Sequence, residues 1–281
     1  MKILITGASG NVGREVSRAL GQTNQLVYVS RSAPKQVPDG AHYAVDMADP
    51  TELPSIFEKE KPDAVIHLAA MLGAICDQEP ELAQKVNVEA TRLLAELSVK
   101  HGVGVFLFPS TAAAYNQTEL AATDEDHNVD PRSIYGKTKV EAERALEALS
   151  KTGATRFAAL RIFNVYGPEF AASLVYKLAH SSPDAPVSLF GMDTFYRDYI
   201  HVDDLVKVLA NLQAYKNLPV FSVFNIAGGK ATNNTELIAQ LTKQGFDPQY
   251  VVQEAAPSYS WANISRAKEQ LGFDPATAIT L

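Results

Sequence analysis

Short runs of β-branched and aromatic residues alternate with longer segments of helical period over the first part of the chain. Between the runs lie amphipathic stretches such as residues 82–99, where apolar side chains recur near helical spacing. Strands separated by helices are typical of right-handed βαβ units, so the pattern predicts an α/β fold: a doubly wound parallel sheet of the Rossmann type. The predicted strands are residues 3–6, 26–30, 43–45, 65–68, 103–108 and 157–165.

The rhythm changes after Tyr166, where Gly167 and Pro168 interrupt the chain. Beyond this break the pattern predicts a helix over 170–180, strands over 187–190 and 199–202, and a helix with Asp203 as its N-cap. We therefore predict a Rossmann domain of residues 1–167 with about 198–228. A small, partly interwoven C-terminal substrate cap would comprise about 168–197 with 229–281.

Composition narrows the class of protein. The 281 residues are 46% hydrophobic and carry 25 Lys and Arg against 32 Asp and Glu, a net charge of −7. An acidic chain is a poor partner for nucleic acid or an anionic membrane surface. It contains no apolar run long enough to span a bilayer and no secretory signal pattern, so we expect a cytoplasmic protein. One cysteine, Cys76, and scattered histidines predict neither a disulfide nor a metal site.

A glycine-rich segment follows the first predicted strand directly and opens a helix. Gly7, Gly10 and Gly13 have the spacing GxxGxxG, a variant of the dinucleotide-binding fingerprint. One glycine permits the tight turn, one lets backbone approach a pyrophosphate, and one allows close helix–strand packing. The helix N-terminus, at Asn11 and Val12, would then present its amides to the anion. The alternative is an ordinary glycine-rich turn, but its place at the first βα turn favours a dinucleotide.

The end of the second predicted strand distinguishes between dinucleotides. NAD sites usually carry a carboxylate there, which hydrogen-bonds the ribose hydroxyls. This chain has Ser30, Arg31 and Ser32 instead. A guanidinium can hold a 2′-phosphate with its planar fork, so the sequence favours NADP(H), with NAD(H) possible. The alternative is that Arg31 is a solvated loop charge.

Three further side chains suggest carbinol–carbonyl chemistry. Tyr135 and Lys139 are spaced i, i+4 and would share one helical face. An ammonium beside a phenol favours the phenolate, so Tyr135 is a candidate general acid/base. Thr111, at the end of the fifth predicted strand, could hydrogen-bond the same substrate oxygen. A lone YxxxK is more often a helix-surface pair, and only its combination with the glycine loop makes it specific.

Taken together, these motifs resemble the extended short-chain dehydrogenase/reductases, the NAD-dependent epimerase/dehydratase family, over nearly the whole chain. The resemblance rests on the glycine loop, the Thr111, Tyr135 and Lys139 set, and several longer segments. These segments are Asp46-Met47-Ala48-Asp49, the VIHLAA run at 65–70, Asn87 in Val86-Asn87-Val88, the LRIFNVYGP run at 160–168 and the RDYIHVDD run at 197–204.

The resemblance implies a role for each matching residue. It makes Tyr135 the acid/base, Lys139 its pKa-lowering partner and ribose ligand, Thr111 the residue that orients the substrate oxygen, and Asn87 a support of the active-site hydrogen bonds. In the cofactor cleft, it places Asp46 and Met47 beside the adenine and Leu68, Ala69 and Ala70 along the wall. Asn164 and Arg197 match positions that often hold a nucleotide-sugar diphosphate. Alternatively, Asp46 caps a turn, Arg197 pairs with Asp198, and His67 and His201 are satisfied core histidines.

Two departures from the family pattern bear on the reaction. Family 4,6-dehydratases carry an Asp-Glu pair directly after the threonine that Thr111 matches, whereas this chain has Ala112 and Ala113. Neither alanine can transfer a proton, so dehydration is not expected. The segment after Gly167-Pro168 and the C-terminal end are short, which reduces the predicted substrate cap and weighs against a large nucleotide-diphosphate substrate.

These features favour an NAD(P)-dependent reductase or dehydrogenase acting on a sugar, most readily a nucleotide-sugar. The alternatives are a nucleotide-sugar epimerase with tightly bound NAD and, less consistent with intact Tyr135 and Lys139, a non-catalytic NADP sensor. The helices predicted over 82–99 and 135–150 could form a homodimer interface through Leu93, Leu97, Leu146 and Leu149. Those leucines could equally all face the sheet.

Overall fold

The computed structural model describes residues 1–281, which divide into two compact units. The first unit comprises residues 1–116, 128–161 and 206–224, and the second comprises 117–127, 162–205 and 225–281. The predicted domains break the chain at other residues, notably at 167, 198 and 228. Because a compact unit need not coincide with the part of a chain that binds one ligand, the predicted domain roles stay predictions.

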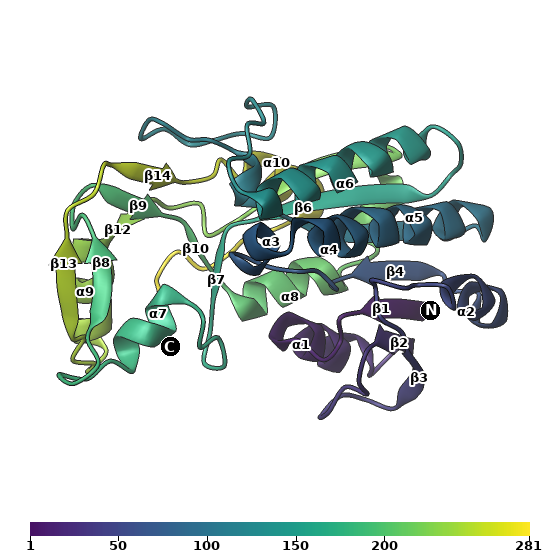
Figure 1. Ribbon diagram of the computed structural model, residues 1–281, viewed down its shortest axis with the longest axis horizontal. Coiled ribbons are helices and arrows are strands. Elements are labelled where there is room, and N and C mark those ends of the chain that lie inside the picture. Colours follow the sequence, from purple (N-terminus) through teal and green to yellow (C-terminus); the bar gives the residue numbers. More distant parts are fainter. The chain divides into compact units, whose positions relative to one another are not determined.

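A seven-stranded sheet forms the centre of the fold, in the order β11-β6-β5-β4-β1-β2-β3 (Figure 1). The pairings from β3 across to β5 are all parallel. This arrangement confirms the predicted doubly wound α/β fold. Its strands are β1 (Lys2–Thr6), β2 (Gln25–Ser30), β3 (Gly40–Ala44), β4 (Ala64–His67), β5 (Val105–Thr111), β6 (Arg156–Ile162) and β11 (Phe221–Ile226).

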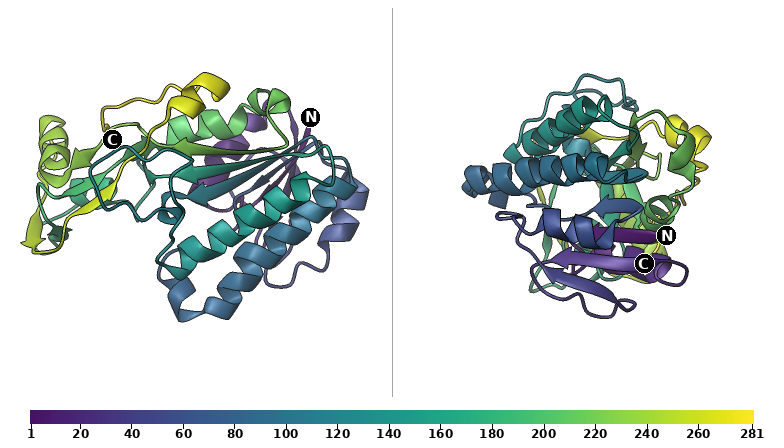
Figure 2. Two further views of the ribbon diagram at one scale, coloured as in Figure 1. Left: turned by 90° about the horizontal axis from the view of Figure 1, so that it is seen from above. Right: turned by 90° about the vertical axis from the view of Figure 1, so that its right-hand side faces the viewer.

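Helices cover both faces of the sheet, as parallel strands buried on each side require. In Figure 2, α5 (Ala90–Lys100) and α6 (Ile134–Ser150) lie side by side on one face, and α1 (Asn11–Leu20) lies on the other. Three further helices precede α6: α2 (Leu53–Glu60), α3 (Ile75–Gln78) and α4 (Pro80–Gln84). The 3-10 turn η2 (Ala112–Ala114) follows β5, and α8 (Val202–Ala210) and the 3-10 turn η3 (Ala214–Asn217) precede β11.

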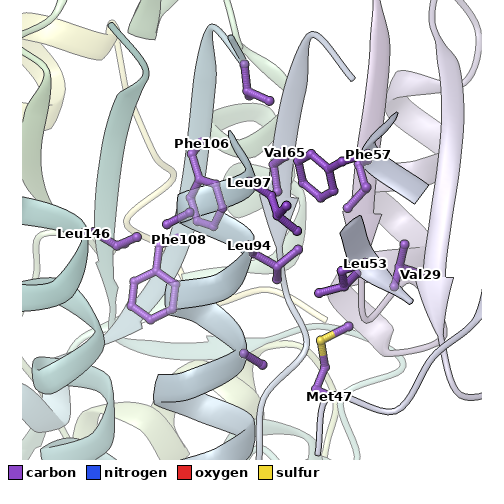
Figure 3. Packing of buried hydrophobic residues seen from close by; sticks show 14 of the residues in the cluster. Val29, Met47, Leu53, Phe57, Val65, Leu94, Leu97, Phe106, Phe108 and Leu146 are labelled. Carbon is purple, nitrogen blue, oxygen red and sulfur yellow. The ribbon is translucent and has the colours of Figure 1, made fainter. Parts of the chain in front are cut away.

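The main core lies between this sheet and α2, α5 and α6 (Figure 3). Leu97 and Leu146 are buried in it, and Leu93 and Leu149 pack against it. Of the two alternatives for these leucines, the structure therefore shows the one in which they face the sheet. They give no support to a homodimer interface.

The segment predicted as one helix over 82–99 is broken in the structure. It consists of α4, a π-helical turn η1 (Lys85–Glu89) and α5. π-Turns are rare and occur often at functional sites. Periodicity could not show this turn, because the apolar positions on either side of it continue at nearly helical spacing.

The second unit has its own smaller core, built from residues such as Tyr166, Leu178, Leu189 and Leu237. The predicted N-cap of α8 is wrong: the helix begins at Val202, and the His201 Nδ1 atom accepts the Asp203 N–H at 3.2 Å. The other elements are β7 (Asn164–Tyr166), α7 (Leu174–Ala179), β8 (Val187–Phe190), β9 (Phe195–Arg197), β10 (Tyr199–His201), β12 (Thr232–Asn233), α9 (Asn234–Lys243), β13 (Tyr250–Gln253), β14 (Ser258–Ser260) and α10 (Ser265–Leu271). No helix of the chain combines the length and hydrophobicity needed to cross a bilayer.

Candidate active site

A cleft of about 530 Å³ opens where β1, β2 and β4 end. In open parallel sheets, ligands bind at the carboxyl ends of the strands. The cleft brings together eight of the predicted cofactor residues: Gly7, Gly10, Arg31, Asp46, Met47, Leu68, Ala69 and Ala70. Asn11, Val12 and Gly13 form the first turn of α1 and do not line it. Sequence analysis missed a set of lining residues that includes Ser9, Met71, Leu72, Ile75, Leu82 and Val86.

The three loop glycines have different roles, and together they fit a dinucleotide. Gly7 has φ +68°, and a Cβ atom there would lie 2.7 Å from the Ala69 backbone nitrogen. A Cβ atom at Gly13 would lie 2.4 Å from the Gly7 carbonyl oxygen, so both glycines are required by backbone packing. Gly10 is exposed and lines the cleft. A Cβ atom there would lie 3.4 Å from the Gly7 carbonyl oxygen, which is an ordinary contact distance. The open backbone at Gly10 and the start of α1 form a cradle for a pyrophosphate.

The cleft end after β2 is basic and polar. Ser30, Arg31 and Ser32 line it, and Arg31 is exposed. The Ser30 hydroxyl donates to the Ser32 carbonyl at 2.8 Å, which holds the turn closed. Asp46, after β3, accepts the Ala48 N–H at 2.9 Å, so it caps a turn as well as lining the cleft.

Tyr135 and Lys139 lie on α6, whose N-cap Ser133 accepts the Gly136 N–H at 3.0 Å. Burial raises the pKa of Tyr135 to about 12, and a hydrogen bond with the Thr111 side chain acts in the opposite direction. Thr111 and Tyr135 are therefore adjacent. The expected lowering of the Tyr135 pKa by Lys139 is not found: burial has the largest effect, and Thr111 and Cys76 are the side chains that act on the Tyr135 hydroxyl.

Lys139 is buried at 2% exposure, and its Nζ atom lies 3.8 Å from the centroid of the Phe108 ring. Burial lowers the pKa of Lys139 to about 7, while Glu143 acts to raise it. The Lys139 side chain therefore changes between the ammonium and the neutral amine near neutral pH, as residues at general acid–base sites often do.

Asn87 lies at the centre of the π-turn and connects the cleft to α6. Its Oδ1 atom accepts the Met71 N–H at 2.8 Å, and its Nδ2 atom donates to the Met71 carbonyl at 3.1 Å. The same Nδ2 atom donates to the Thr138 hydroxyl at 3.1 Å, next to Lys139. The π-turn orients the Asn87 amide so that it contacts both Met71 and Thr138. This geometry supports the predicted role of Asn87 in the hydrogen bonds of the site.

His67 is a satisfied core histidine, one of the alternatives drawn from the sequence. Its ring nitrogens lie 2.7 Å from the Thr6 hydroxyl and 2.9 Å from the Thr91 hydroxyl. Burial lowers its pKa to about 3, so the imidazole is neutral at physiological pH.

Asn164 and Arg197 belong to the second unit. The Asn164 amide donates to the Asp198 carbonyl at 2.9 Å. Arg197 does not pair with the Asp198 carboxylate; its guanidinium donates to the Tyr196 and Ser258 carbonyls and to the Ser258 hydroxyl. The Arg197 charge is therefore half-buried without an ion-pair partner, which leaves it able to bind an anion.

A buried polar cluster that sequence analysis missed lies in the first unit. Glu143 accepts hydrogen bonds from Ser110 and from Arg161, and Arg161 donates to the Tyr115 hydroxyl. The spacing of Tyr135, Lys139 and Glu143 at i, i+4 and i+8 is a signal that could have found Glu143 from the sequence.

Comparison with known proteins agrees with this geometry. Residues 3–227 match the profile of the NAD dependent epimerase/dehydratase family. The chain belongs to this family. As a member of it, the protein is an enzyme, and the resemblance seen in the sequence is confirmed.

Individual relatives are similar to the chain over almost their whole length. A UDP-glucose 4-epimerase from Rhizobium leguminosarum bv. trifolii is 28% identical, with 97% of this chain and 92% of the relative covered. A dTDP-glucose 4,6-dehydratase from Streptomyces griseus is 27% identical over 98% of this chain and 89% of its own. Among solved structures, MoeE5 in complex with UDP-glucuronic acid and NAD superimposes with a TM-score of 0.87 at 26% identity, covering 99% of this chain and 94% of MoeE5. The similarity to a UDP-glucose 4-epimerase favours the epimerase alternative over the reductase that the sequence favoured.

Proposed function

We propose that the protein is an NAD-dependent 4-epimerase of a nucleotide-sugar. The observation that carries the proposal is the meeting of Thr111 and Tyr135 at the end of β5, beside buried Lys139, with alanines next to Thr111. The three side chains supply what oxidation and reduction of a carbinol need. Ala112 and Ala113 supply no further acid or base, which favours epimerisation over dehydration. The similarity to a UDP-glucose 4-epimerase supports the same choice.

In this proposal the chain's own residues handle the proton and the orientation. To take the proton from the sugar hydroxyl, Tyr135 must be the phenolate, which the positive charges of Lys139 and of bound NAD⁺ would favour over the phenol of the free enzyme. The phenol formed in this way returns the proton when the carbonyl is reduced from the other face. Thr111 holds the same oxygen, and the Lys139 ammonium stabilises negative charge on it. The cleft lined by Gly7, Gly10 and Ala69 would hold NAD, which would supply a reversible hydride acceptor.

The test is incubation of the purified protein with UDP-glucose or UDP-glucuronic acid, with the products separated chromatographically. We expect the 4-epimer of one of them to accumulate without net change in NADH absorbance, because the hydride returns to the sugar. Stoichiometric consumption of NADPH with a keto-sugar, and no epimer, would establish the reductase alternative instead.

We also propose that the cleft accepts NADP(H), the cofactor that the sequence favours. No carboxylate follows β2 to repel a 2′-phosphate, and Arg31 stands exposed at the cleft. We expect Arg31→Ala to weaken NADP binding by about 1–3 kcal/mol and to leave NAD binding unchanged, since only the phosphate needs the guanidinium. Calorimetric titration with both cofactors measures this, with exposed Lys35→Ala as the control. Equal losses for NAD and NADP would show that Arg31 does not read the phosphate.

Arg197 is proposed to bind the diphosphate of the nucleotide-sugar. A half-buried guanidinium without a carboxylate partner retains its charge for an anionic ligand. We expect Arg197→Met to raise KM about tenfold or more with a smaller change in kcat, as loss of uniform binding does. Ser258→Ala removes a hydrogen-bond partner of Arg197 but keeps the cation, and should leave KM within about threefold. A kcat effect without a KM effect would contradict this assignment.

Homodimerisation and a cytoplasmic location stay predictions. The leucines first considered for an interface pack on the core. A dimer that used α5 and α6 would have to use their outer faces, and light scattering coupled to gel filtration tests whether the protein is a dimer.

A further inference from the structure

A cluster of four polar side chains lies buried between α6 and the ends of β5 and β6. The side chains of Glu143 and Arg161 are 5% and 6% exposed. Arg161 Nη2 donates to Glu143 Oε2 at 2.7 Å, and Arg161 Nε lies 3.2 and 3.3 Å from the two carboxylate oxygens. The Ser110 hydroxyl donates to Glu143 Oε1, and Arg161 Nη1 donates to the Tyr115 hydroxyl at 2.8 Å.

The cluster joins the two chain segments that carry the catalytic side chains. Ser110 directly precedes Thr111 in β5, and Tyr115 follows the short turn η2 after it. Glu143 is one helical turn beyond Lys139 and two beyond Tyr135, on the same face of α6. The Ser110–Glu143 hydrogen bond therefore connects the strand end holding Thr111 with the helix holding Tyr135 and Lys139.

Glu143 is also the carboxylate whose charge acts on Lys139. The other titratable groups around Lys139 supply no fixed negative charge. Tyr135 on α6 and Cys76 on α3 both have raised pKa values and are protonated at neutral pH, and His67 on β4 is neutral. From β5 the Lys139 ammonium meets the ring of Phe108. Arg161 in turn holds the Glu143 carboxylate in place.

We propose that Glu143 and Arg161 form a positioning pair of the active site. Glu143 fixes the distance between Thr111 and Tyr135 through Ser110, and it supplies the negative charge that favours the ammonium form of Lys139. Neither residue touches the substrate. This inference rests on the proposed function only for its kinetic readouts.

The competing explanation is that the pair serves folding alone. Buried ion pairs can often be replaced by apolar side chains without loss of stability, whereas removing one partner leaves a costly unpaired charge. Replacing both residues therefore separates a structural role from a positioning role.

The experiment compares four variants in the full chain. Glu143→Leu/Arg161→Met replaces the pair, Ser110→Ala removes only the link to the Thr111 strand, Glu143→Gln removes one charge, and exposed Glu147→Gln is the matched control on α6. Thermal unfolding verifies the fold of each. We expect the paired replacement to unfold near the wild-type temperature and Glu143→Gln to unfold earlier.

For the paired replacement we expect kcat to fall about 100-fold, because small displacements of reacting groups are costly, with KM changed much less. The alkaline limb of its pH profile should move down by about one pH unit, since Lys139 loses the charge that raises its pKa. Ser110→Ala should lower kcat about tenfold with no shift of the limb. Wild-type kcat and pH profiles in both folded variants would overturn the proposal.

The pH dependence of NADH affinity, measured by calorimetry, gives a readout that needs no substrate. Wild-type affinity should weaken as pH rises through the titration of Lys139, and the midpoint should lie about one pH unit lower in the paired replacement. If the wild type epimerises no nucleotide-sugar, the proposed function fails, and this midpoint still decides the positioning role: an unchanged midpoint overturns it.

Discussion

Tyr135→Phe is expected to lower turnover about 1,000-fold while the protein stays folded and still binds its cofactor. In the proposed mechanism the Tyr135 hydroxyl moves the substrate proton, and general acid–base catalysis contributes about 10²–10⁴-fold. The ring is half-buried and Phe retains its packing, so the unfolding temperature should change little. Steady-state epimerisation rates, calorimetric cofactor binding and thermal unfolding measure the three quantities.

Exposed Tyr250→Phe is the matched control for this substitution, because it removes a phenolic hydroxyl far along the sequence from β5 and α6. It should retain wild-type activity. Should Tyr135→Phe keep more than about a tenth of the wild-type rate, another group must transfer the proton, and the assigned chemistry would be wrong.

The free enzyme should also lose activity as pH rises through about 7, the pKa that burial gives Lys139. Below this pH the side chain is an ammonium and stabilises a developing alkoxide, and above it the amine cannot. In the free enzyme Tyr135, with its pKa raised to about 12, does not titrate in this range. The alkaline limb of kcat/KM reports the lysine directly.

Substitution of the loop glycines should have effects that differ in kind. Gly13→Ala places a Cβ atom 2.4 Å from the Gly7 carbonyl oxygen, so backbone must move; we expect a loss of about 1–3 kcal/mol of stability and of most cofactor affinity. Gly10→Ala meets no such clash, and Gly10 has φ −77°, which alanine tolerates. Because Gly10 lines the cleft, we expect the added methyl group to take up space in it. We expect normal stability with cofactor affinity reduced about tenfold or more.

Chemical denaturation and calorimetric titration with NAD and NADP separate the two glycine effects. Gly104→Ala, at an exposed turn before β5 where a Cβ atom comes no nearer than 3.5 Å to Asp63, is the control for both. Unchanged cofactor affinity in Gly10→Ala would mean that the dinucleotide does not pass over this part of the loop.

Local patterns in the sequence account for much of the fold and the candidate site. Short runs of β-branched and aromatic residues alternate with amphipathic stretches, and this alternation predicts the parallel sheet. It can be recognised from the sequence because the periodicity of a strand or a helix involves only residues close together along the chain. GxxGxxG predicts the turn at β1, and the i, i+4 spacing predicts that Tyr135 and Lys139 share a face. Ala112 and Ala113 argue against dehydration from identity alone. The choice of reductase over epimerase rested on Arg31, a single exposed charge, and the relatives favour the other reaction.

Other features depend on segments far apart in sequence. In the π-turn, the Asn87 amide hydrogen-bonds the N–H and the carbonyl of Met71 and the hydroxyl of Thr138. At the start of α8, the His201 ring accepts a hydrogen bond from the Asp203 N–H. Neither contact follows from periodicity.

The sequence by itself determined the doubly wound fold, and it predicted the dinucleotide loop and the candidate catalytic side chains, because each is encoded in spacing along one segment. Only the tertiary structure decided their electrostatics and support. Burial raises the pKa of Tyr135 although a lysine is one turn away, and Glu143 meets Ser110 and Arg161 only once α6 packs against β5 and β6. Desolvation and long-range hydrogen bonds depend on what surrounds a residue in space, and spacing along the chain does not report it.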